Sequence, residues 1–81
     1  MQIRVLLFAG LANALNTREA ILALQDGATV QTAIDELIHQ LPDLKTHLPS
    51  LAFAVNHAFV KTNQVLADGD ELALIPPVSG G

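Results

Sequence analysis

The chain has 81 residues, a net charge of −4, no cysteine, and a 51% share of hydrophobic residues. This length predicts one domain, and the lack of cysteine excludes disulfides, thiolate metal sites and a cysteine nucleophile. The four scattered cations form no basic stripe for nucleic acid, and no apolar run approaches the roughly 20 residues that cross a bilayer.

The N-terminal half predicts two strands with a short helix between them. Residues 2–8 alternate in a period of two, which is typical of a strand. Residues 9–16 are small or helix-forming and indicate a short helical turn that Asn16 ends. Residues 18–24 predict a second strand, followed by turn residues, and we expect the two strands to pair antiparallel. Because the first residues lack the continuous apolar run of a signal peptide, we expect a cytoplasmic protein.

One amphipathic helix follows. Its apolar stripe consists of Val30, Ile34, Leu37, Ile38 and Leu41. The Thr29 hydroxyl is placed to cap the first free N–H groups, and Pro42 disfavours helix at the residue before it.

The remainder predicts three further strands. Residues 42–50 indicate an irregular connection with room for one helical turn. Residues 51–56 predict a strand, and residues 59–61 predict a short strand after a tight turn at residues 56–58. Residues 71–75 predict the last strand. Pro76-Pro77 then stops any ladder.

This order of elements predicts an α+β fold. A single amphipathic helix can bury its stripe only against one face of a sheet. The first and last strands are expected as neighbours in its middle, which is the ubiquitin-like β-grasp roll of about five strands. We expect the domain to cover residues 1–75 and an extended C-terminal tail to cover residues 76–81.

The tail carries the most accessible reactive group. Pro76 and Pro77 favour an extended backbone. Gly80 and Gly81 lack a Cβ, so the end of the chain can pass through a channel too narrow for side chains. The Gly81 carboxylate is a poor electrophile and needs activation, for example to an acyl-adenylate. Since the sequence has no phosphate-binding loop, that chemistry belongs to a partner.

Strand phase indicates a partner-binding patch. If Val5 and Leu74 face the helix, then Phe8 and Ile75 face away from it. Phe59 is two residues from Lys61 on the same predicted strand, so its side chain points to the same face as that charged residue. We predict that Phe8, Phe59 and Ile75 form an exposed apolar patch. The alternative is that a layer of loop covers them.

The polar residues suggest no catalytic or metal centre. His39, His47 and His57 fall on a predicted helix, a loop and a turn, without the spacing of a metal site, so we interpret them as surface residues. The acids within residues 68–71 resemble the start of a calcium loop but lack its later ligands, and we interpret them as turn-forming.

The chain resembles the small, sulfur-carrying subunit of molybdopterin synthase over its whole length. The similarity lies in Val5-Leu6-Leu7-Phe8-Ala9, Ala54-Val55-Asn56, Leu66-Ala67-Asp68-Gly69-Asp70-Glu71-Leu72-Ala73 and Pro76-Pro77-Val78-Ser79-Gly80-Gly81. The last block is the most specific, because related carriers for thiamine synthesis and tRNA thiolation as a rule lack the Pro-Pro-Val-Ser approach.

The resemblance implies a reaction cycle centred on Gly81. An adenylating enzyme would activate Gly81 with ATP and Mg, a sulfur donor protein would convert it to a thiocarboxylate, and sulfur would pass to a pterin precursor in the large synthase subunit. Two transfers would build the dithiolene that holds molybdenum. The chain itself would bind no cofactor or metal and would not be an enzyme on its own.

The resemblance also implies how the subunits meet. The tail residues Pro76, Pro77, Val78, Ser79 and Gly80 would insert into the large subunit, in a heterotetramer of two large and two small subunits. Family analogy places the contact on Phe8, Phe59 and Ile75, the residues that strand phase selects.

Several alternatives remain at this stage. One is a carrier for thiamine synthesis or tRNA thiolation, and another is a protein modifier joined to lysines. A third is a β-grasp interaction module whose Gly-Gly end is never activated, and a fourth is an enzyme that uses the histidines.

Overall fold

The computed structural model describes residues 1–77. Predictions made for Val78, Ser79, Gly80 and Gly81 lie outside the described residues. The elements in chain order are β1 (Gln2–Leu7), α1 (Ala9–Leu15), β2 (Glu19–Ala23), α2 (Val30–Gln40), α3 (Leu44–His47), the 3-10 helix η1 (Leu48–Ser50), β3 (Ala52–Val55), β4 (Ala58–Val60) and β5 (Glu71–Ile75).

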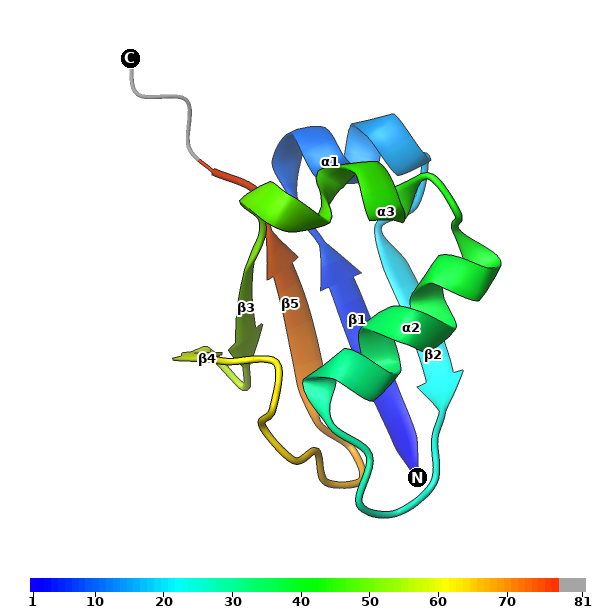
Figure 1. The fold of residues 1–81 in the computed structure, drawn as a ribbon, viewed down its shortest axis with the longest axis vertical. Coiled ribbons are helices and arrows are strands. Elements are labelled where there is room, and N and C mark those ends of the chain that lie inside the picture. Colours follow the sequence, from blue (N-terminus) through cyan, green and yellow to red (C-terminus); the bar gives the residue numbers. More distant parts are fainter. Residues whose placement is uncertain (78–81) are drawn as a thin grey trace.

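Residues 1–77 form a five-stranded mixed sheet in the order β2-β1-β5-β3-β4 (Figure 1). The first and last strands, β1 and β5, pair parallel in the middle, and β2, β3 and β4 add antiparallel. Both the antiparallel pairing of the first two strands and the central pairing of the first with the last are confirmed.

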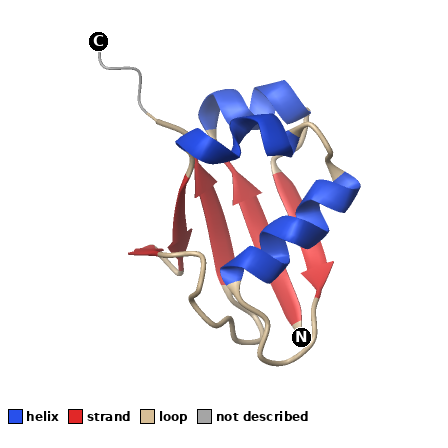
Figure 2. Cartoon of the chain, viewed as in Figure 1, coloured by secondary structure: helices blue, strands red, loops and turns tan. Residues whose placement is uncertain are grey.

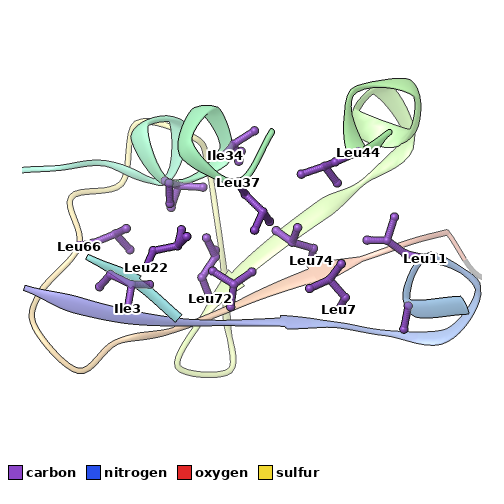
Figure 3. Close-up of a cluster of buried hydrophobic side chains, with 14 residues drawn as sticks. Ile3, Leu7, Leu11, Leu22, Ile34, Leu37, Leu44, Leu66, Leu72 and Leu74 are labelled. Atoms are coloured by element: carbon purple, nitrogen blue, oxygen red, sulfur yellow. The ribbon is translucent and has the colours of Figure 1, made fainter. Parts of the chain in front are cut away.

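The helices lie over one face and across one end of the sheet (Figure 2). The apolar side of α2 packs onto the sheet and, with α1 and α3, closes a core of buried aliphatic side chains (Figure 3). Its fully buried large members are Ile3, Val5, Leu22, Val30, Ile34, Leu37, Leu44, Leu72 and Leu74. The predicted two-layer α+β roll is therefore confirmed.

Local signals set the ends of α2 as predicted. Thr29 is the N-cap: its hydroxyl accepts a hydrogen bond from the Thr32 N–H at 3.3 Å, and the Thr32 hydroxyl accepts one from the Thr29 N–H at 3.1 Å. These reciprocal bonds satisfy two backbone donors that a helix start leaves free. The helix ends at Gln40, two residues before Pro42.

Residues 42–50 are more helical than the predicted irregular connection. They form α3 and η1 in succession. Leu44 is fully buried in the core, and Leu48 packs against it. Burying both residues favours continuous turns, and His47 consequently lies on α3 rather than on the predicted loop.

Backbone with positive φ shapes both the β3 to β4 turn and the end of α1. Asn56 and His57, with φ of 49° and 74°, form the two-residue turn between β3 and β4, which is tighter than the three-residue break expected. This pair of positive φ values suits the twist of a hairpin. Asn16, also left-handed, ends α1 as predicted.

Candidate partner-binding site

The face of the sheet opposite α2 is open among residues 1–77. In β1, Ile3, Val5 and Leu7 are buried, whereas Arg4 and Leu6 alternate onto the other face. The pairings place Ile21, Glu71, Ala73, Ile75, Ala54 and Phe59 on that same face, which we call the open face.

Phe8, Phe59 and Ile75 come together on the open face. One surface hollow of about 210 Å³ has His57 and Glu71 in its lining together with five apolar residues, Phe8, Phe59, Ile75, Ala54 and Ala73. These five residues are called the patch below. Phe59 is 75% exposed and Phe8 is 45% exposed, and Ile75 is half-buried. The alternative that a loop layer covers them is wrong for Phe8 and Phe59.

The small residues of the middle strands shape this hollow. Ala54 pairs with Ala73 on one side and with Phe59 on the other. Because alanines form the floor, the aromatic ring of Phe59 borders a depression rather than a flat surface. Phe8 reaches the patch from just beyond β1, where it is the N-cap of α1 rather than the last residue of a strand.

Charged side chains border the patch. Glu71 lies between Arg4, which donates a hydrogen bond to its carboxylate, and His57, whose Nε2 is 3.6 Å from the other carboxylate oxygen. The hydrogen bond that Arg4 donates to Glu71 raises the pKa of Arg4, and the negative charge of the Glu71 carboxylate raises it further. The sequence prediction missed this cluster. Arg4 and Glu71 carry opposite charges at outward-facing positions of the two central strands, and this pattern is the sequence signal that pointed to the cluster.

Asn56 fixes the hairpin to the start of β5. Its side-chain amide donates to the Asp70 carboxylate at 2.9 Å and accepts from the Glu71 N–H at 3.0 Å. Its own N–H donates to the Glu71 carbonyl at 2.9 Å. These contacts position both His57 and Glu71 at the edge of the patch.

The root of the tail lies at the same end of the sheet as Phe8. Ile75 ends β5, and the half-buried Pro76 follows it directly. Figure 1 shows residues 76 and 77 leaving the sheet where α1 and the α3 to η1 segment lie. A second hollow of about 460 Å³, here called the root hollow, is lined by Ala9, Gly10, Leu11, His47, Ser50, Leu51, Pro76 and Pro77.

The three histidines lie on separate elements. His39 lies on α2, His47 on α3 and His57 in a turn, and residues 1–77 contain no group of histidine, cysteine or acidic side chains that could hold a metal ion. Asp70 accepts a hydrogen bond from the Ala67 N–H at 2.7 Å, which is the turn-forming behaviour expected, whereas Asp68 accepts one from the Gln2 N–H at 2.7 Å and ties the loop to the start of β1. Within the described part of the chain, no helix has the length and apolar character needed to span a membrane.

A mixed sheet with central parallel strands, one main helix on one face and an open apolar face beside the tail root defines a ubiquitin-like β-grasp protein. The chain belongs to the ThiS family, whose sequence pattern matches residues 5–81. The predicted fold class and the resemblance to sulfur carrier subunits are thereby confirmed.

Individual relatives cover the full chain. It is 37% identical to the molybdopterin synthase sulfur carrier subunit of Chlamydomonas reinhardtii, over 100% of both chains. It superposes on SAMP1 of Haloferax volcanii with a TM-score of 0.93 at 31% identity, covering 100% of both chains, and the curated relative of that organism is named small archaeal modifier protein 1. The protein also superposes on a chain in the solved complex of subunits 1 and 2 of the molybdopterin-converting factor from Helicobacter pylori. The TM-score is 0.73 at 26% identity, and the match covers 100% of both chains.

Proposed function

We propose that this protein is the sulfur carrier subunit of a molybdopterin synthase and that the Gly81 carboxylate carries the sulfur as a thiocarboxylate. The observation that carries the proposal is the position of the patch beside the root of the segment that leads to Gly80-Gly81. Full-length similarity to a sulfur carrier subunit supports it.

Activation of Gly81 precedes sulfur transfer in this proposal. A carboxylate oxygen attacks the α-phosphorus of ATP in a partner enzyme that also holds Mg, and pyrophosphate leaves. The resulting acyl-adenylate is an electrophile, so a donor protein that supplies sulfur at the oxidation level of sulfide can form a C–S bond at the carbonyl carbon while AMP leaves with the carboxylate oxygen that attacked ATP. The carrier contributes the terminal carboxylate, and the nucleotide chemistry belongs to the partner.

The patch then docks the carrier on the large synthase subunit. Phe59 and Phe8 present exposed apolar surface, and burying a large apolar side chain is worth about 1.5–3 kcal/mol. Docking converts attack by the thiocarboxylate on the pterin precursor into a positioned reaction of high effective concentration. The small subunit acts as the non-catalytic, sulfur-donating component of a complex of two large and two small subunits.

The tail connects docking to chemistry. Pro76, Pro77, Val78, Ser79 and Gly80 lead from β5 to the reactive group and insert into the large subunit. Two consecutive glycines allow the terminal carbonyl to enter a channel that a side chain would block.

A protein modifier is the second candidate function, and the close superposition on SAMP1 favours it. A modifier and a sulfur carrier share the activation of Gly81 and differ in the acceptor. In a modifier, a lysine amine of another protein attacks the activated carbonyl and forms an isopeptide bond.

Intact-mass measurement tests the proposal. The protein is produced together with the molybdenum-cofactor enzymes of its own host, and the expected product has one oxygen replaced by sulfur at Gly81. Incubation with the large subunit and pterin precursor should return the plain carboxylate. Isopeptide-linked adducts without any thiocarboxylate would favour the modifier, and an unchanged carboxylate would contradict both functions.

A further inference from the structure

The fold gives no structural reason for a glycine at position 10. Gly10 is the second residue of α1, and glycine is a poor helix former. Positive φ, the usual reason for glycine, occurs instead at the preceding Ala9, whose φ is 49°. A Cβ added at Gly10 would meet no heavy atom within 4 Å. A side chain at position 10 would therefore fit the free chain.

Gly10 forms part of the wall of the root hollow. The hollow is mainly apolar, with Leu11, Leu51 and the two prolines among its lining residues. The Ser50 hydroxyl donates to the His47 carbonyl at 3.0 Å, so its proton is already used within the chain. A lining of this kind suits an apolar side chain better than a charged one.

The root hollow adjoins both the patch and the tail. Ile75 of the patch is bonded to Pro76 of the hollow, and Phe8 of the patch is bonded to Ala9 of the hollow. Val78 is bonded to Pro77, and neighbouring Cα atoms are about 3.8 Å apart. A protein that covers the patch and holds the tail from residue 78 onward therefore reaches the hollow.

We propose that the root hollow receives an apolar side chain of the large synthase subunit and that Gly10 keeps the space for it. This rests on the proposed function, in which the same subunit covers the patch and takes the tail. The absent side chain at position 10 allows close approach of the partner, which is the second common reason for glycine. Ala9, the first residue of α1, contributes by turning the chain sharply after Phe8.

Calorimetric titration of the purified large subunit with variants of this protein substituted at position 10 tests whether the root hollow is a contact surface. We expect Gly10→Ala to weaken binding slightly and Gly10→Arg to weaken it by at least about tenfold, as for a central interface position. The matched control is Gln40→Arg, which adds the same charge at an exposed residue of α2 and should stay within about twofold of the unchanged chain. All three variants should remain folded, with Gly10→Ala melting at or above the temperature of the unchanged chain.

The outcomes separate this inference from the proposed function. Failure of the unchanged chain to bind the large subunit would overturn both. If Phe59→Arg abolishes binding while Gly10→Arg binds as the unchanged chain does, the patch stands and the root hollow is no contact. If Gly10→Arg instead lowers only the conversion of Gly81 by the activating enzyme, the hollow belongs to that enzyme and the proposal is also overturned.

Discussion

Phe59 has the most exposed large apolar side chain in the described part of the chain. It contributes little to the core, so Phe59→Arg should change the free energy of unfolding by no more than about 0.5 kcal/mol. The same change should weaken binding of the large subunit by more than about tenfold, because an aromatic anchor is replaced by a charge that must be desolvated. Calorimetric titration and thermal unfolding measure the two effects.

Val65→Arg is the matched control for Phe59→Arg. Val65 is also apolar and is 57% exposed, but it pairs with Thr29 at the start of α2 and is outside the patch. Its substitution should leave binding unchanged. Equal loss of affinity in both variants would mean that added charge, rather than the patch, controls the interaction.

Asn56 combines a backbone requirement with side-chain hydrogen bonds. Asn56→Gly keeps the φ of 49° without strain but removes two side-chain bonds, which should destabilise the fold by about 1 kcal/mol. Asn56→Ala removes the same bonds and keeps a Cβ in the left-handed region without the polar side chain that lets Asn tolerate it, so it should be about 1 kcal/mol less stable than Asn56→Gly. Urea unfolding of both variants measures the difference, and equal stabilities would show that the turn relaxes to another conformation.

Sequence reasoning found part of the site at the level of residues. Phase alone selected Phe8, Phe59 and Ile75, because alternation along a strand fixes which side chains share a face. It did not find the cluster of Arg4, Glu71 and His57: the opposite charges lie on outward-facing positions, but the contact also depends on the register between strands far apart in sequence. The position of Ile21 on the open face was missed for a related reason. Ile21 precedes Leu22, and two adjacent apolar residues do not show which of them faces the core; the pairing of Ile21 with Arg4 shows it.

At the scale of elements, α2 is held by its own N-terminal residues. Thr29→Ala removes the acceptor for the Thr32 N–H and should destabilise the fold by about 1 kcal/mol. Thr29→Ser keeps the hydroxyl and should recover most of that loss. Chemical unfolding is the measurement. Because α2 lies on the face opposite the patch, binding of the large subunit should be unaffected, and weakened binding would contradict the separation of the two faces.

The elements differ in how far local sequence determines them. Both ends of α2 were predictable because a capping threonine and a proline act within one turn. The helical turns at residues 44–50 were not, since they form where Leu44 enters a core that also needs α2 and the sheet. The β3 to β4 turn was placed correctly but predicted one residue too long, because only pairing of Val55 with Ala58 shows that two residues suffice.

At the scale of the whole molecule, the core and the surfaces proposed to bind a partner are separate. The buried cluster runs from Ile3 to Leu74, and the patch and root hollow lie at the surface before residue 78. Docking and chemistry should therefore be separable by changing the chain end alone. Under the proposed function, this separation would let two partners recognise one folded domain while the Gly81 carboxylate changes its chemical state.

Deletion of Gly81 tests that separation directly. The shortened chain should unfold at the same temperature as the complete chain, because the core cluster is intact, and it should accept no sulfur. It should still bind the large subunit through the patch, and so compete with the sulfur-loaded carrier and inhibit pterin conversion in a reconstituted assay. Adding Phe59→Arg to the deletion should abolish this inhibition. A shortened chain that does not compete at all would mean that the tail, rather than the sheet face, supplies the affinity.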